Sequence, residues 1–400
     1  MIAASSSLAF RSLLKSAAAR SGLTRAPGRL TGLSPSAAGF HLAALGARIV
    51  AVVPTDADVE RLTSDTRFFL GAMEGLSTVD LESAVVSFPS QEVDPYRGLT
   101  PHLEVAAARA RALHLLTTGA ARVVITSARA LLPRLSAPAR LAAAGITLRT
   151  GMEIAPQDLG ERLALAGFSP GDPVDEHGEF CVRGGVVDFF AAFEAQPIRL
   201  EFIGDIIESI RRYDAATQRS QRALDQAAIT PLRELLGAEG GADDPAAFDR
   251  SSSIVDYARL AGASLVVVEP DDVNERGNAL EKQWRASAVD MEARGRTVPP
   301  YEHIAIAWKD VRAWLASGRE LSQLAIGDGD GPEAQHVNCL PSVEYHGRIA
   351  DWMSEVRAAR AREETTVFLA ATPGRAERTI ELAADYDIRA RDIATADDLA

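Results

Sequence analysis

The amino-acid sequence predicts an α/β fold in two pieces, with a small mixed α/β domain, rich in antiparallel strands, inserted between them. Residues 1–150 alternate short β-branched apolar runs with helical stretches, which is typical of a parallel sheet covered by helices. Residues 151–224 instead hold short alternating strands separated by glycine turns. The α/β pattern returns over residues 225–400, so we expect the two outer pieces to form one domain.

The first piece opens on a segment that has two interpretations. Residues 1–20 are rich in Ser and Ala, carry basic residues and contain no acidic ones, which resembles a transit peptide. The same segment places Leu8, Phe10, Leu13 and Leu14 on one side of a helix. We favour the helix. A secretory signal fits less well, because the basic residues follow the apolar stretch.

The rest of the first piece alternates strands and helices. Ser127 stands where it can cap the last expected helix. Short apolar runs of this kind are typical of buried parallel strands. The expected strands are residues 47–54, 85–88 and 122–126, and the expected helices are 56–69, 104–116 and 128–135.

The inserted domain is predicted as one helix followed by an antiparallel meander. The helix is expected over residues 156–166. Gly184-Gly185 and Gly204-Asp205 are two-residue turn signals of the kind that join hairpin strands. The strands that these turns would join are residues 179–183 with 186–190, and 197–203 with 206–213.

The second piece is predicted to contain strands at 264–269 and 366–370, with helices between and after them. Its loop at 327–332 has an Asp-x-Asp spacing that hints at calcium. Position 12 counted from Asp328 is Cys339 rather than Glu, so the loop does not fit a calcium-binding pattern. We therefore expect no metal site.

The composition disfavours some classes of function. The 400 residues carry 42 basic and 55 acidic side chains, a net charge of −13, which disfavours tight DNA binding unless arginines gather on one face. No window holds 18 uncharged apolar residues, so no membrane partner is expected. The isolated Cys181 and Cys339 fit a reducing cytoplasm. The nearest arginine cluster, either a DNA patch or solvated residues paired with acids, is Arg109, Arg111, Arg122, Arg129 and Arg134.

A degenerate nucleotide loop precedes the strand at 47–54. Gly32, Ser34 and Gly39 remain of a Gly-x-x-x-x-Gly-Lys-Ser/Thr pattern, but Phe40 and His41 follow where the Lys and hydroxyl belong. Without the Lys, the charge that stabilises phosphoryl transfer is missing. The seven histidines are scattered and form no catalytic motif, so we expect no catalytic residues and no cofactor in this chain.

The segment 176–220 is the most informative. Because side chains alternate along a strand, Glu179 and Arg183 share one face and Phe180 lies on the other. An exposed Arg and an aromatic residue near a hairpin tip are typical of a protein-binding anchor. The alternative is that Arg183 forms a structural ion pair with Glu179 or Asp188.

These residues resemble the domain shared by the repair helicase UvrB and the transcription-repair coupling factor Mfd. The departures are Ala191, where the pattern has Pro, and Ile206, where it has an acid. Residues 88–102, 122–135 and 214–220 favour the coupling factor over UvrB. The matching positions are Gly178, Glu179, Phe180, Arg183, Gly184, Asp188, Arg199, Glu201, Phe202, Gly204, Asp205, Glu208, Ser209, Ile210 and Arg211.

The resemblance implies a degenerate helicase-like, P-loop-type parallel-sheet domain with a UvrA-binding domain inserted. It implies that Phe180, Arg183, Glu179, Gly184 and Arg211 contact UvrA, which would recruit nucleotide-excision repair to stalled RNA polymerase. Full-length relatives use ATP and Mg, and reach RNA polymerase and double-stranded DNA through further domains that this chain lacks, so it resembles a fragment. The alternative implied function is a part of an ATP-dependent DNA translocase or helicase with direct DNA contact.

Overall fold

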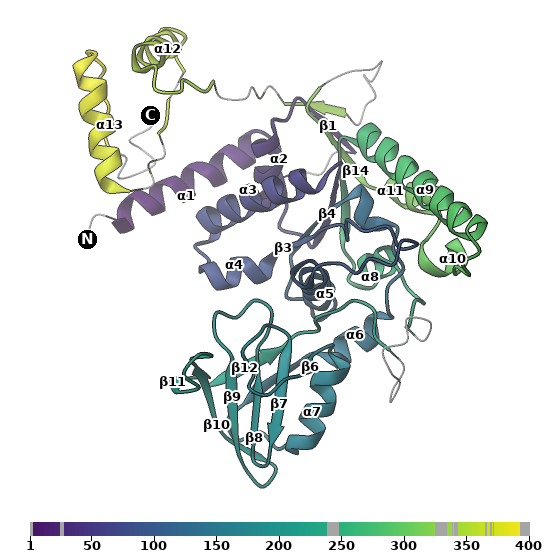
Figure 1. The fold of residues 1–400 in the computed structure, drawn as a ribbon. Helices are drawn as coiled ribbons and strands as arrows, with labels where there is room; N and C mark the ends of the chain where they lie inside the picture. The colour runs from purple at the N-terminus through teal and green to yellow at the C-terminus, as the bar shows by residue number, and fades with distance from the viewer. Residues whose placement is uncertain are drawn as a thin grey trace.

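The computed structural model describes residues 3–24, 28–237, 248–324, 334–337, 339, 343–364, 366–368, 370 and 372–392, with side chains described from residue 10 onward. The expected calcium-like loop at 327–332 lies outside these residues. Two bodies are visible: a helix-covered parallel sheet, and a smaller antiparallel sheet beneath it (Figure 1). The predicted fold class is confirmed.

The large sheet interleaves strands from both outer pieces of the chain. All its ladders are parallel. The second-piece strands β13 and β14 lie between β2 and β1 of the first piece, so neither piece completes the sheet alone. In spatial order the strands are β15 (Ala334–His336), β1 (Arg29–Thr31), β14 (Arg319–Ser322), β13 (Ser264–Val268), β2 (Ile49–Val53), β4 (Val123–Ser127) and β3 (Val85–Phe88).

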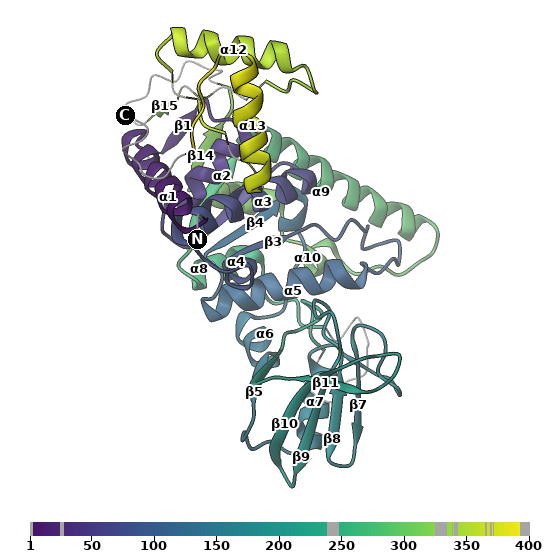
Figure 2. The ribbon, with the colours of Figure 1, turned by 90° about the vertical axis from the view of Figure 1, so that its left-hand side faces the viewer.

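Helices cover both faces of this sheet. One face packs against α1 (Ala3–Arg20), α2 (Pro35–Ala44), α3 (Asp56–Glu74) and α4 (Thr78–Ala84). The other packs against α5 (Leu103–Thr118), α8 (Ile254–Leu260), α9 (Pro270–Ala293), the short α10 (Tyr301–Ile304) and α11 (Trp308–Leu315). Figure 2 shows the sheet between these two layers. The first helix is confirmed: it packs on α2 and α3, with Leu14 of its expected apolar face buried and Phe10 against the same core.

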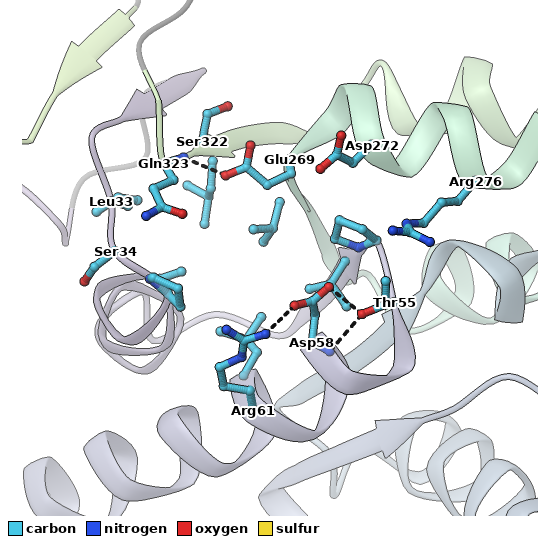
Figure 3. Close-up of a pocket in the computed structure, with 17 residues that line it drawn as sticks. Leu33, Ser34, Thr55, Asp58, Arg61, Glu269, Asp272, Arg276, Ser322 and Gln323 are labelled. Carbon is cyan, nitrogen blue, oxygen red and sulfur yellow. Dashed lines mark hydrogen bonds and ion pairs between the residues drawn. The ribbon is translucent and has the colours of Figure 1, made fainter. Parts of the chain in front are cut away.

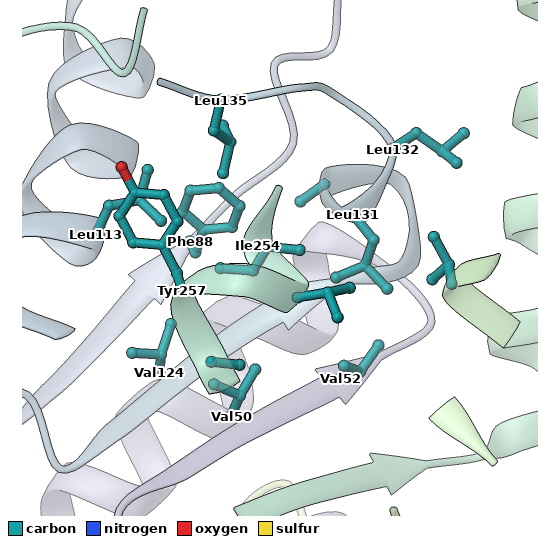
Figure 4. Close-up of a cluster of buried hydrophobic side chains, with 14 of the residues drawn as sticks. Val50, Val52, Phe88, Leu113, Val124, Leu131, Leu132, Leu135, Ile254 and Tyr257 are labelled. Carbon is teal, nitrogen blue, oxygen red and sulfur yellow. The ribbon is translucent and has the colours of Figure 1, made fainter. Parts of the chain in front are cut away.

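Alternation along the central strands decides which layer each side chain meets. Val50 and Val52 of β2 point into the core beneath α5 and α8, whereas Ile49 and Ala51 point to the opposite face. Figure 4 shows the first of these cores, where Tyr257 of α8 closes over β2 and β4. Because both faces are buried, the strand reads as a continuous apolar run, which is why the sequence revealed it.

The small sheet has strand order β11-β10-β9-β8-β7-β6. It is antiparallel except for the short β6–β7 ladder. Helix α7 packs on one face, and the ladder of β5 with β12 joins the sheet's core cluster, just outside the expected limits of 151 and 224. The elements are β5 (Ile146–Arg149), α7 (Pro156–Leu165), β6 (Ser169–Pro170), β7 (Glu179–Arg183), β8 (Val186–Phe189), β9 (Ile198–Ile203), β10 (Ile206–Tyr213), β11 (Ser220–Ala223) and β12 (Gln226–Ile229).

Two sequence-based predictions are wrong. Residues 128–135 do not form an α-helix: only the 3-10 turn η1 (Ala128–Leu131) forms, because Pro133 has no N–H to continue a helix. The next two amides, of Arg134 and Leu135, donate to Ile304 and Ser252 instead. Ser127 caps nothing; its hydroxyl donates to Asp56. The connection then runs through α6 (Pro138–Ala144) to β5.

The strand expected at 366–370 is also absent among the described residues of that segment. Thr366–Phe368 belong to no helix or strand and pair with no strand of a sheet. Phe368 instead packs edge-on against Trp352, with ring centroids 4.7 Å apart. A β-branched run needs a neighbouring strand to become part of a sheet, and here it lies between α12 (Ile349–Ala361) and α13 (Pro373–Asp385).

Candidate functional site

Two hairpin turns lie together at one end of the small sheet. Gly184 and Gly204 each adopt positive φ, 56° and 61°, as two-residue hairpin turns require. The N–H of Phe202 donates to the carbonyl of Gly185 over 2.8 Å, which holds the two turns side by side. We call residues 183–186 and 203–206 the hairpin end. It is far from the large sheet (Figure 1).

A ladder of alternating charges crosses the sheet beside the hairpin end. The carboxylate of Asp188 is 1% exposed and accepts two hydrogen bonds from Arg199, each 2.8 Å long. This interaction raises the pKa of the Arg199 guanidinium. Arg183 lies 3.4 Å from Asp188 and 3.1 Å from Asp172. Arg199 therefore neutralises the buried carboxylate, and Arg183 is a second, outer partner.

Arg183 is available for binding in a way that Arg199 is not. The Arg183 side chain is 48% exposed, and its nearer partner Asp172 is 57% exposed, so that ion pair is screened by water. The structural ion pair weighed for Arg183 exists with Asp188 but not with Glu179. Glu179 instead accepts hydrogen bonds from the amides of Asp175 and Glu176. Glu179 thus holds the preceding turn.

Phe180 corrects one expectation. It is not an exposed aromatic: its side chain is 8% exposed and belongs to the core under the sheet. The alternation of side chains that exposes Arg183 turns Phe180 inward. Phe180 supports the strand from below, and Gly184 supplies the turn. Arg211 lies exposed on β10, opposite Arg199 in the β9–β10 ladder, and so lies on the same face of the sheet as Arg199.

Exposed apolar residues complete the hairpin end. Ile203 and Ile206 flank the Gly204-Asp205 turn and are 67% and 47% exposed. From the sequence, Ile206 was expected only to remove a charge, and Ile203 was not among the candidate residues. The available signal was an isoleucine on each side of a two-residue turn, where polar residues are usual. Exposed isoleucines beside an exposed arginine make a surface suited to recognising a protein.

The degenerate nucleotide loop lies at the carboxyl edge of the large sheet. Gly32, with φ 78°, leads from β1 into Ser34, whose hydroxyl accepts the Ala37 amide and caps α2. Gly39 is not in this loop. It is buried within α2, where an added Cβ would stand 2.7 Å from the Cβ of Asp65 on α3. Gly39 thus allows two helices to pack closely.

A pocket of about 210 Å³ opens beside Ser34 where β2, β13 and β14 end (Figure 3). Its charged residues are Asp58, Glu269 and Asp272 against Arg61 and Arg276. Arg61 is already paired with Asp58 at 2.8 Å. With three carboxylates against two arginines the lining has a net charge of −1, which disfavours a polyphosphate, and no lysine is found among the described residues that line it.

The residues that could hold a cofactor fit ATP poorly. The Ser34 hydroxyl, which would otherwise approach a metal, faces Cys339 at 3.2 Å. Across the described residues, no group of three or more His, Cys, Asp or Glu is arranged to hold a metal ion. Glu269 adopts a strained φ of 50°, and its carboxylate accepts the Gln323 amide at 2.6 Å. This hydrogen bond links the end of β13 to the end of β14.

The five arginines named as a cluster in the sequence have different surroundings in the fold. Arg109 is fully buried, its guanidinium stacked 4.0 Å from the ring centroid of Phe88, and Arg129 is exposed. Four of the five have separate partners: Arg109 pairs with Glu234, Arg111 donates to the Glu82 carbonyl, Arg122 pairs with Glu74, and Arg134 donates to the Glu302 carbonyl. Arg109 and Arg122 thus pair with acids, as the second interpretation expected, whereas Arg111 and Arg134 bond to carbonyls. None of the described helices is long and apolar enough to cross a membrane.

Comparison with known proteins identifies the small sheet. Residues 146–235 match the family described as the UvrB interaction domain. The chain contains a UvrB interaction domain. The match begins at β5 and ends just after β12, so it includes the two-stranded ladder that packs onto this domain's core.

Curated relatives extend the similarity beyond this domain. The chain is 34% identical to the transcription-repair-coupling factor of Myxococcus xanthus over 213 residues, which is 52% of this chain and 17% of that protein. It is 30% identical to that of Mycobacterium bovis over 305 residues, 72% of this chain and 22% of the relative. The chain thus spans less than a quarter of these relatives. It resembles the N-terminal region of a transcription-repair-coupling factor, with a UvrB interaction domain inside.

Proposed function

We propose that this chain is an adaptor module that binds UvrA through the hairpin end of its UvrB interaction domain. The observation that carries the proposal is the half-exposed Arg183 beside exposed Ile203 and Ile206, at the tip of a domain that projects from the main body. Binding would place UvrA beside a transcription-repair-coupling factor in the bacterial cytoplasm and so recruit nucleotide-excision repair to stalled RNA polymerase.

Arg183 is the central anchor in this proposal. A guanidinium can form a bidentate pair with a partner's carboxylate, and its exchange of exposed Asp172 for that carboxylate costs little. Removing a central arginine from an interface costs roughly 2–4 kcal/mol, or about 30- to 1000-fold in affinity. Arg211 and Gly184 belong to the same surface, while Glu179 and Phe180 maintain the strand that presents Arg183.

The test is calorimetric titration of the chain with purified UvrA. We expect binding by the wild type and at least about a tenfold loss in Arg183→Ala. Arg162→Ala, an exposed arginine on the helical side of the same domain, is the matched control and should bind like the wild type. No binding by a folded wild-type chain, or equal loss in both variants, would reject the proposal.

We further propose that the chain does not hydrolyse ATP by itself. The missing Lys, the carboxylates of the pocket in Figure 3 and the buried position of Gly39 support this. A phosphate-release assay with and without double-stranded DNA measures it directly. Turnover above that of a buffer blank, lost on Ser34→Ala substitution, would mean that the chain retains a motor activity.

A further inference from the structure

A hollow of about 520 Å³ opens at the amino edge of the large sheet, the edge opposite the degenerate nucleotide loop. Three-residue connections lead there from α8 into β13 and from α11 into β14. Ser264 and Arg319, the first residues of these two parallel strands, line the hollow. We call it the amino-edge hollow. None of its lining residues belongs to the hairpin end or to the pocket in Figure 3.

Two arginines of the amino-edge hollow lack an acidic partner. Arg259, in the last turn of α8, is exposed, and Arg319 is half-buried. Within the described part of the chain, neither guanidinium forms an ion pair or a hydrogen bond. Asp310 is the one carboxylate among the described lining residues, so the lining has a net charge of +1. The hollow therefore attracts a group that carries a single negative charge.

The helix ends beside the hollow do not account for these arginines. Basic side chains often stand near a helix C-terminus because they bond its free carbonyl groups. After α8 this role belongs to Arg48, which donates to the Ala261 carbonyl over 2.8 Å. After α11 the Ser317 hydroxyl donates to the Trp314 carbonyl over 2.6 Å. Both arginines of the hollow can therefore bind a ligand without giving up a hydrogen bond.

Apolar side chains lie beside the arginines in the hollow. Trp314 and Leu265 line it and are 9% and 8% exposed, so they form its base. Gly318 packs closely against this base: a Cβ there would stand 2.7 Å from the Cγ of Leu265. An occupant that places an apolar group on Trp314 and Leu265 would remove their remaining exposed surface from water, which is favourable.

Charge separates the possible occupants. A phosphate monoester carries about −1.5 to −2 at pH 7, which exceeds the net charge of the lining and would stand beside Asp310. A nucleic-acid strand would bring a row of phosphates to a chain of net charge −13. A glutamate or aspartate side chain carries one charge and pairs with a guanidinium in a bidentate geometry. A protein segment can also supply the apolar group.

We propose that the amino-edge hollow binds an acidic segment of a partner protein, in which one carboxylate lies beside a large apolar side chain. The carboxylate would pair with Arg259 and Arg319, and the apolar side chain would cover Trp314 and Leu265. This inference does not depend on the proposed function, because the hollow lies in the large domain and the proposed UvrA surface in the inserted one.

The test uses the full chain and a fluorescent, end-capped peptide with one glutamate between two phenylalanines. We expect saturable binding by anisotropy at low salt, and at least about tenfold weaker binding when the glutamate is replaced by glutamine. Arg259→Gln and Arg319→Gln should each weaken binding of the glutamate peptide by at least about fivefold. Arg162→Gln, the same charge change at an exposed position of α7, is the matched control and should bind like the wild type.

Asp310→Asn gives a readout that loss of folding cannot produce. Removing the opposing carboxylate should tighten peptide binding by about two- to fivefold, as for other exposed charge pairs. No saturable binding, equal loss in the Arg259 and Arg162 variants, or unchanged or weaker binding by Asp310→Asn would overturn the proposal. Tighter binding of oligothymidylate than of the peptide, lost in Arg259→Gln, would overturn the choice of a protein partner. Arg259→Gln should bind UvrA like the wild type, which separates this hollow from the proposed function.

Discussion

The charge ladder predicts that two arginines on one sheet have opposite roles. Arg199→Ala removes both hydrogen bonds to Asp188, a carboxylate that is 1% exposed. Breaking a buried ion pair by removing one partner costs about 3–5 kcal/mol. Arg199 also stacks 4.5 Å from the ring centroid of Tyr213, a contact worth about 1 kcal/mol that the substitution also removes. Arg183, at 3.4 Å, is too far from Asp188 to replace two bonds of 2.8 Å.

Arg183→Ala has a smaller expected effect on folding. Its side chain is 48% exposed, its pair with Asp172 is screened, and Asp188 keeps Arg199. We expect a loss of about 0–1 kcal/mol, as for other exposed ion pairs. The two substitutions therefore separate folding from binding: Arg199→Ala unfolds the sheet locally, and Arg183→Ala weakens UvrA binding in a folded domain.

Amide hydrogen exchange is the suitable assay, because the chain has two bodies and global unfolding need not be two-state. A loss of 3 kcal/mol raises local opening of residues 186–213 by roughly 150-fold, and a loss of 1 kcal/mol raises it by about fivefold. Removing both charges, in Asp188→Asn with Arg199→Ala, should recover part of the loss. Equal acceleration by Arg183→Ala and Arg199→Ala, or less than about fivefold by Arg199→Ala, would refute this reasoning.

Three further predictions follow from packing and burial. Gly39→Ala should destabilise the large domain by about 1–3 kcal/mol, since its Cβ would stand 2.7 Å from that of Asp65; Gly374→Ala, with no neighbour within 4 Å, is the control in thermal melts. Glu234→Ala should cost about 3–5 kcal/mol by leaving the fully buried Arg109 unpaired, measured by urea denaturation, and an unchanged midpoint would contradict it. Burial lowers the pKa of His41 from 6.5 to about 4, so on acidification the unfolded chain binds a proton there before the folded chain does. The free energy of unfolding therefore falls as the pH is lowered from 6.5 to about 4. His41→Gln should flatten that dependence of the urea midpoint, and identical slopes would contradict it.

Much of the architecture could be predicted from the sequence alone. The buried strand β2 is a continuous apolar run, β3 and β4 are mostly apolar, and the hairpins are marked by Gly184-Gly185 and Gly204-Asp205. Such local signals are strong because the burial of a strand is reflected in the pattern of its own apolar residues. Missed elements have weak local signals. β1 and β15 are three residues each and become strands only because a partner lies beside them.

For the candidate site too, local sequence patterns determined some features and tertiary contacts decided the others. The residue pattern determined that Arg183 and Phe180 lie on opposite faces and that the phosphate-binding Lys is missing. Tertiary structure decided which of them is exposed: the core beneath the sheet takes Phe180, and Asp188 takes Arg199 while leaving Arg183 half free. It also placed Ile203 and Ile206 beside the Gly184 turn, and divided the arginine cluster among separate partners. Alternation and turn chemistry act between neighbours in sequence, whereas burial and ion pairing depend on residues that only folding brings together.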